Sequence, residues 1–227
     1  MHSLHVVIQA FPSILSGSLV TLGIVFGALS LGLIVGLTFA ILQVYGRSWQ
    51  KFLISLYVWL FRGFPILVLL FLGYGCFVAL GLPANPFIIS CVVLGCTSTA
   101  YQSQIFRGAI QSLRTGQLQA ARALGMHDLQ AIRCIIIPQA LRLSIPGWSN
   151  EYSILLKDSA ICFVLGTQDI MAKTAFAAAR THEHLALYAA AGLIYFVLTL
   201  IVVKLLTRLE HKLHIPGFTQ ANGENNL

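Results

Sequence analysis

The sequence predicts an all-α, polytopic membrane protein with about five transmembrane helices. Of the 227 residues, 57% are hydrophobic and 9% are charged, whereas soluble domains contain about 25% charged residues. The mean hydropathy is +0.83. The apolar residues form runs long enough to cross a bilayer as helices, which requires about 20 residues each. We therefore expect one membrane domain over residues 1–227.

Five apolar runs are the expected spans. They are residues 13–44, 52–79, 87–107, 139–166 and 186–203. The first run contains Gly23-x-x-x-Gly27 and Gly32-x-x-x-Gly36, a spacing that lets another helix approach closely. Glycine is also ordinary composition in membrane helices. The N-terminal run is too long for the core of a signal peptide, so we expect a retained membrane helix.

An arginine interrupts the second span. A charge at the bilayer centre costs about 2.5–3.5 kcal/mol. Arg62 must therefore pair, reach the interface, face a wet cavity, or mark the cytoplasmic end of a tilted span. Pro65 removes one backbone donor and is expected to bend the helix.

The fourth span combines helix breakers with charged and polar residues: Pro138, Pro146, Asn150, Glu151, Lys157 and Asp158. We expect a discontinuous span shielded from lipid. Such breaks and charges point to a transport site near the midplane. Glu151 and Asn150 are candidates for binding a substrate ammonium or cationic group, and Lys157 for binding a carboxylate. The alternatives are packing, gating, or a structural ion pair of Lys157 with Asp158 or Glu151.

Basic residues are expected to fix the orientation. The net charge of +7 is interpreted as the positive-inside bias of a membrane protein rather than as a nucleic-acid-binding surface. Lysine and arginine gather in the 47–51 turn, in the loop before residue 138 and after residue 203, and are absent from the N-terminal end and the 80–86 turn. We predict an external N-terminus, a cytoplasmic loop and a cytoplasmic C-terminus, with a polar tail over residues 213–227 that is disordered over residues 220–227.

Other motifs argue against metal sites and enzymes. The five cysteines form no Cys-x-x-Cys pair and are expected to be small buried residues. His182 and His184 would not face one another on a helix, so an exposed segment is expected rather than a metal site. The chain contains no Gly-x-x-x-x-Gly-Lys-Ser/Thr phosphate loop, and its spans offer no catalytic constellation.

The loop over residues 108–138 is the most polar stretch between spans. Residues 117–124 are strong helix formers. The expected boundaries are Thr115 as N-cap, Gly125 as a left-handed helix end, Asp128 as the cap of a second helix and Pro138 as the end of that helix. The first helix presents Ala120, Ala121 and Ala123, which leave a partner surface unobstructed. The physics allows either a docking element or merely a folded loop.

The loop pattern resembles that of the permease subunits of ABC importers. Their pattern is Glu-Ala-Ala, three residues, Gly, nine residues, Ile-x-Leu-Pro. Here Gln119-Ala120-Ala121, Gly125 and Ile135-Ile136-Ile137-Pro138 keep that spacing. Gln119 replaces the glutamate, so an ion pair made by that acid is not expected, and Ile137 replaces the leucine.

The resemblance extends along most of the chain and indicates the polar amino acid subfamily. The matching segments are Tyr57-Val58-x-x-Phe61-Arg62-Gly63-x-Pro65, Tyr101-x-x-x-Ile105-x-Arg107-Gly108, Pro138-Gln139-Ala140-Leu141-Arg142 and Leu155-Leu156-Lys157-Asp158-Ser159. Gln104 stands where glutamate is common. Each segment is weak alone, but their order and spacing together are specific.

This resemblance implies the ABC importer permease fold in a bacterial inner membrane, with a pathway for a polar or basic amino acid. It implies a second identical or homologous permease, two cytoplasmic ATPase subunits that bind ATP and Mg, and an external solute-binding protein. This chain would hold no cofactor. The residues implied in ATPase coupling are Gln119, Ala120, Ala121, Leu124 and Gly125. Those expected along the substrate pathway are Asn150, Glu151, Lys157, Asp158 and Arg62. The alternative is a channel or secondary transporter that works without ATPase partners.

Overall fold

The computed structural model describes residues 2–113 and 116–213, and these contain helices and turns but no strand. The elements are α1 (His2–Tyr45), α2 (Ser48–Gly63), α3 (Ile66–Ala79), α4 (Pro86–Ser112), α5 (Gly116–Ala123), α6 (Asp128–Ala131), the π-helix η1 (Ile132–Ile136), α7 (Ile137–Leu143), α8 (Ile145–Asp158), the 3-10 helix η2 (Ser159–Leu165), α9 (Ile170–Thr181) and α10 (His184–Leu213). The all-α helical membrane fold is confirmed. The predictions for Thr115 and for the tail beyond residue 213 lie outside the described residues.

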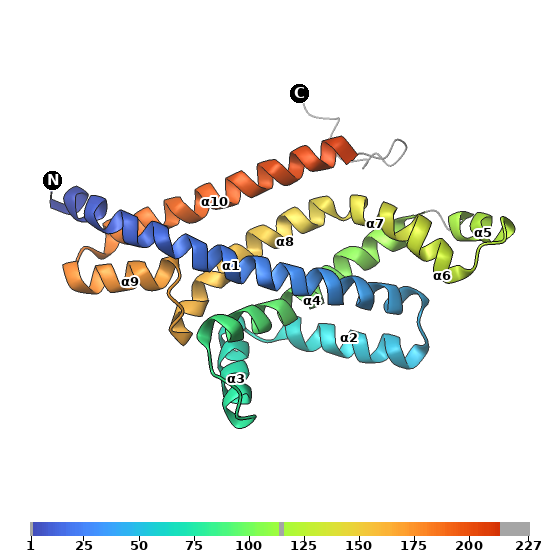
Figure 1. The fold of residues 1–227 in the computed structure, drawn as a ribbon, viewed down its shortest axis with the longest axis horizontal. Helices are drawn as coiled ribbons and strands as arrows, with labels where there is room; N and C mark the ends of the chain where they lie inside the picture. The colour runs from blue at the N-terminus through green and yellow to red at the C-terminus, as the bar shows by residue number, and fades with distance from the viewer. Residues whose placement is uncertain (1, 114–115, 214–227) are drawn as a thin grey trace.

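Long apolar helices run along the molecule (Figure 1). By length and composition, α1 and α10 can each cross a membrane, and the bent pair α2–α3 adds a third span if it counts as one. Helix α4 has 27 residues, but its second half is polar. The expected number of five spans is therefore supported only in part by length and apolarity.

Glycines on α1 form its contact with α4, and the two helices lie against one another (Figure 1). A Cβ added at Gly27 would lie 3.2 Å from Sγ of Cys91, and one added at Gly36 would lie 3.1 Å from the backbone nitrogen of Ser103. Larger side chains would separate the helices at these positions. The spaced glycines therefore act as a packing surface.

The second span is two helices rather than one bent helix, so the predicted bend is in fact a break. The chain bends by 112° between α2 and α3, and α3 points away from the long helices (Figure 1). Phe64 is extended, with φ −91° and ψ 141°, because a residue before proline avoids the helical region. Pro65 then precedes the first turn of α3.

The helix after the polar loop does not end at Pro138, contrary to the sequence prediction. It passes through η1 into α7, with Pro138 in the first turn of α7. The proline ring would clash with the carbonyl four residues earlier in a regular α-helix. A π-helix widens the backbone at that place, and the Ile137 N–H accordingly bonds to the carbonyl of Ile132, five residues back.

The fourth span is discontinuous, as predicted. Ser144 separates α7 from α8, and its hydroxyl donates to the carbonyl of Ala140 at 2.7 Å. Pro146 lies in the first turn of α8. The span then tightens into η2, which ends at Gly166 in the left-handed conformation with φ +94°.

The segment between the fourth span and α10 forms a packed helix. Helix α9 lies against α1 and α10, and it buries Ile170 and Ala178. His182, which follows α9, and His184, which begins α10, are both exposed, as expected. Small residues on α1 admit this segment, since a Cβ added at Gly17 would lie 2.7 Å from the backbone of Asp169.

The cysteines differ from the prediction in their burial. All five are free, but Cys76 and Cys134 are exposed and only Cys162 is buried. Cys76 lies on α3, which contributes few buried residues, and Cys134 lies in η1 beside the polar loop. The apolar residues around each cysteine did not predict whether that cysteine is buried within the chain, because much of a membrane protein's apolar surface faces lipid.

Candidate functional site

The polar loop folds into a helical hairpin, α5–α6. Helix α5 ends as predicted, with Gly125 at φ +81°. The N–H of Gly125 donates to Arg122 O at 3.0 Å, and the N–H of Met126 donates to Ala121 O at 3.0 Å. This pair of bonds is a Schellman motif, which satisfies the last carbonyls of the helix. The hairpin therefore depends on a backbone conformation that glycine adopts readily.

A two-pronged salt bridge closes the hairpin. Arg122 Nε donates to Asp128 Oδ1 at 2.7 Å, and Arg122 Nη2 donates to Oδ2 at 2.9 Å. The hydrogen bonds from Arg122 hold the pKa of Asp128 below its ordinary value. The predicted capping role of Asp128 is wrong, because His127 occupies the cap position and Asp128 begins α6. The carboxylate serves Arg122 instead.

The exposed face of the hairpin is apolar at two leucines. Leu124 is 82% exposed and Leu129 is 78% exposed. Gln119 and Ala120 are also exposed, whereas Ala121 is buried. The prediction that Ala121 contributes to an open alanine face is therefore wrong, because this residue packs inside the hairpin. Sequence reasoning missed Leu129, although an isolated leucine in a polar loop was the available signal.

A pair of amides joins the hairpin to the fourth span. Gln117 Nε2 donates to Gln139 Oε1 at 3.0 Å, and Gln139 Nε2 donates to Gln117 Oε1 at 2.9 Å. Gln139 Nε2 also donates to the carbonyl of Ile135 at 3.0 Å. These bonds link α5 to α7, the segment that continues into α8.

Glu151 ends a buried polar network within the membrane helices. Ser98 Oγ donates to Glu151 Oε1 at 2.8 Å. Gln102 Nε2 donates to Ser98 Oγ at 3.0 Å and to Leu29 O at 3.1 Å. The indole N–H of Trp148 donates to Gln102 Oε1. The network ties α1, α4 and α8 together, and it gives the carboxylate a fixed position.

Arg62 lies on a polar cavity of about 510 Å³ beside α2 and α4. Its guanidinium stacks 4.8 Å from the centroid of the Tyr101 ring. In the same cavity, Gln104 Nε2 donates to Gln43 Oε1 at 3.0 Å. Of the possibilities for Arg62, the structure shows a polar cavity and a cation–π contact. Ser98 and Tyr101 are one turn apart on α4, so one helix carries the partners of both Glu151 and Arg62.

The other predicted pathway residues do not join Glu151 in one cluster. Asn150 and Lys157 are exposed, and Asp158 is half-buried at the end of α8. Glu151 and Lys157 are separated by about 9 Å along the helix axis. Among the described residues the only salt bridge is Arg122–Asp128, so the alternative of an ion pair at Lys157 is not observed. The described residues also contain no group of three or more His, Cys, Asp or Glu suited to a metal ion.

The interrupted polar span, the buried carboxylate and the projecting helical hairpin are compatible with a membrane permease. Residues 32–215 match the family described as binding-protein-dependent transport system inner membrane component. The chain belongs to this family, and it is therefore an integral membrane permease.

Curated relatives cover most of the chain. The probable amino-acid permease protein YxeN of Bacillus subtilis (strain 168) is 34% identical over 202 residues, which are 86% of this chain and 88% of the relative. The histidine/lysine/arginine/ornithine transport system permease protein HisM of Escherichia coli (strain K12) is 30% identical over 207 residues, 87% of each chain.

Solved structures share the fold. A chain in the crystal structure of an amino acid ABC transporter with histidines is 34% identical, with a TM-score of 0.81, and the match covers 90% of this chain and 96% of that chain. A chain of the MetNI methionine ABC transporter, in an inward-facing conformation, has a TM-score of 0.74 at 17% identity over 92% of this chain and 97% of that chain. This second likeness concerns the fold alone.

Proposed function

We propose that this chain is the transmembrane permease subunit of an ABC importer and forms the pathway for a polar or basic amino acid, driven by partner ATPase subunits. The observation that carries the proposal is the family match over residues 32–215, which includes both the α5–α6 hairpin and Glu151 with its partner Ser98. The names of the relatives supply the substrate class, since they are amino-acid permeases.

In this proposal the hairpin docks on a cytoplasmic ATPase. The exposed leucines Leu124 and Leu129 offer an apolar contact surface, and Gln119 and Ala120 are exposed on the same hairpin. Gly125 and the Arg122–Asp128 bridge keep that surface rigid. Because the amide pair ties α5 to α7, a movement of the docked hairpin is transmitted to α8. ATP and Mg are bound by the ATPase and not by this chain.

The substrate pathway follows α4 and α8. Glu151 is suited to a substrate ammonium or cationic side chain, whereas Arg62 and Lys157 are suited to its carboxylate. Asn150 and Lys157 share one exposed stripe of α8, seven residues apart. A second permease subunit, identical or homologous, would cover this stripe and complete the pathway. An external solute-binding protein would deliver the amino acid.

The docking surface can be tested with a pair of matched substitutions. Leu124→Glu places a charge on the proposed contact, and Leu185→Glu does so at the other end of the molecule, where the side chain is 87% exposed. We expect Leu124→Glu to reduce copurification of the ATPase and ATP-driven amino-acid uptake by at least tenfold, and Leu185→Glu to retain both. Equal copurification and uptake in the two variants would remove the hairpin from the coupling mechanism.

The class of transporter has a separate test. Uptake into vesicles should cease when internal ATP is removed. Uptake that continues without ATP, by a chain that captures no ATPase when it is expressed with its genomic neighbours, would support a channel or secondary transporter instead.

The proposed orientation places the loop in the cytoplasm and the N-terminus outside. Cys134 lies in the loop and is exposed, as is Cys76 on α3, so in a Cys76→Ser background a membrane-impermeant thiol reagent should label Cys134 only from the cytoplasmic side. A Thr181→Cys variant that lacks both Cys76 and Cys134 should be labelled only from the external side. Labelling of Cys134 from outside would reverse the topology.

A further inference from the structure

The polar cavity beside Arg62 holds a second arginine. Arg62 of α2 and Arg107 of α4 both line this cavity of about 510 Å³, and the described residues around it include no aspartate or glutamate. The Arg62 guanidinium stacks on the Tyr101 ring, and neither arginine forms a salt bridge with a described residue. The Arg62–Arg107 cavity therefore contains two positive charges and no acid that compensates them.

The two arginines belong to the helix faces that border the cavity. On α4, Tyr101, Gln104 and Arg107 follow one another at intervals of three residues, and all three line the cavity. On α2, Trp59 and Arg62 are also three residues apart and line it from the other side. Residues at this spacing are neighbours on a helix surface. Both arginines thus leave their helices on the sides that border the same cavity.

A glutamine stands in the cavity where an acid could neutralise the arginines. Glutamate is common at the position of Gln104 in the permeases that this chain resembles. Here the amide of Gln104 lines the cavity, and its Nε2 donates to Gln43 Oε1 at 3.0 Å and to Ser103 Oγ at 3.1 Å. A carboxylate at this place would favour the charged form of its basic neighbours. The neutral amide leaves both positive charges to an external anion.

The lining of the cavity suits an anion that has a short carbon skeleton. A guanidinium binds a carboxylate through two parallel N–H···O bonds, so two guanidiniums from different helices match a ligand that has two carboxylates. The lining also includes the apolar side chains of Val58 and Trp59, which a carbon chain can contact and a free phosphate ion cannot use. A cationic ligand is disfavoured by both arginines.

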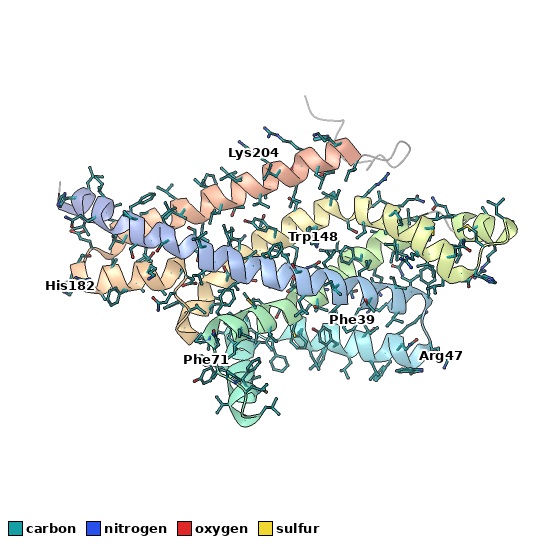
Figure 2. All side chains as sticks on the ribbon, in the orientation of Figure 1. Phe39, Arg47, Phe71, Trp148, His182 and Lys204 are labelled. Carbon is teal, nitrogen blue, oxygen red and sulfur yellow. The ribbon has the colours of Figure 1, made fainter. Side chains whose placement is uncertain are left out.

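The cavity lies toward the loop end of the helices. Gln43, which lines it, is in the last turn of α1, and Arg107 is near the end of α4. Figure 2 labels Arg47 in the turn after α1, and this turn lies toward the same end of the molecule as the α5–α6 hairpin (Figure 1). In the orientation proposed above, a solute reaches the cavity from the cytoplasm.

We propose that the Arg62–Arg107 cavity binds a small cytoplasmic dicarboxylate, with one carboxylate on each guanidinium. A free dicarboxylic acid and an amino acid with an acidic side chain both offer this chemistry. Binding at this site goes beyond the transport function and needs no ATPase. Its consequence for transport rests on the proposed function: a bound dicarboxylate occupies the Arg62 guanidinium and therefore competes there with the carboxylate of the transported amino acid.

Isothermal titration calorimetry on the full-length chain in phosphatidylcholine nanodiscs tests the site directly. Succinate should bind saturably with one molecule per chain. Succinamate, in which one carboxylate is an amide, should bind about tenfold more weakly because it loses one charge-assisted pair. L-Glutamate that binds as well as succinate would identify amino acids as a source of the ligand. Much weaker binding of L-glutamate would identify free dicarboxylic acids as the source, because its ammonium group is then not tolerated.

Two variants assign the binding to the cavity, and each has a matched control. Arg107→Gln should abolish the preference for succinate over succinamate, whereas Arg133→Gln, which removes an exposed cation outside the cavity, should bind like the parent. Gln104→Glu places an acid beside the arginines and should weaken succinate by about tenfold or more. Gln119→Glu makes the same change on the exposed hairpin and should have no effect.

Four results would overturn the proposal. The first is equal affinity of the parent for succinate and succinamate, and the second is unchanged succinate binding in Gln104→Glu. The third is tighter binding of inorganic phosphate than of succinate. The fourth is loss of succinate binding in nanodiscs that contain phosphatidylglycerol, which would mean that a lipid phosphate occupies the cavity. Because the titration measures neither uptake nor ATP hydrolysis, these results leave the proposed transport function to its own tests.

Discussion

A substitution at Gly125 tests the effect of backbone strain alone, because an added Cβ there meets no neighbouring atoms. Its φ is +81°, and a Cβ added there would meet nothing within 4 Å. The cost of Gly125→Ala is therefore conformational and amounts to about 1–2 kcal/mol for an L-residue held in the left-handed region. That cost weakens the bonds from residues 125 and 126 that close α5. A free-energy cost of this size would raise the population of molecules in which the end of α5 is open by about 5- to 30-fold.

Hydrogen exchange of the α5 amides, followed by mass spectrometry on the protein in nanodiscs, measures that population. Protection of α5 should fall by about 5- to 30-fold in Gly125→Ala. Gly125→Asn should recover much of it, because asparagine tolerates this conformation. Gly108→Ala is the matched control, since its added Cβ also meets open space but its backbone is helical. If Gly125→Ala exchanges like the parent, the glycine does not hold the hairpin, and the left-handed cap is incidental.

Three further predictions concern other parts of the chain. Glu151→Gln keeps a side-chain oxygen that accepts the hydrogen bond from Ser98, so the transporter should still assemble. Its substrate-stimulated ATPase activity should change severalfold. Loss of assembly would instead indicate that Glu151 has a structural role. Gly17→Val should destabilise the protein by about 1–3 kcal/mol through overpacking, seen as a lower melting temperature in detergent, whereas Gly75→Val, which faces open space, should not. Because the pKa of Asp128 is lowered in the hairpin, its ion pair with Arg122 should stabilise the hairpin above pH 3.8, the ordinary pKa of the carboxyl group, and α5 should exchange faster as the pH falls further. Arg122→Gln should remove this dependence of α5 exchange on pH. If the dependence persists in that variant, another group is responsible for it.

The sequence predicted the features that are local. The left-handed end of α5 follows from Gly125, and the broken fourth span follows from its prolines and polar residues. The glycine spacing on α1 predicted a close helix contact, although not that α4 supplies the partner. These inferences succeed because backbone conformation and helix interruption depend mainly on neighbouring residues.

The features that the sequence did not predict depend on contacts distant along the chain. The amide pair of Gln117 and Gln139 forms only because α5 folds back onto α7. The polar cavity at Arg62 needs α2 and α4 side by side, and its position could not be read from one apolar run. The burial of Ala121 and the exposure of Cys134 likewise depend on which side of a helix the rest of the chain covers.

The glycine contact between α1 and α4 bears on how the protein is made. Both partners lie before residue 113, so the contact can form in the membrane while the later half of the chain is still being synthesised. Close backbone approach needs little rearrangement of side chains, and helices already inserted associate by such packing. The α1–α4 pair is thus suited to act as the first assembled unit during biogenesis, a template onto which the interrupted span and α10 are later added.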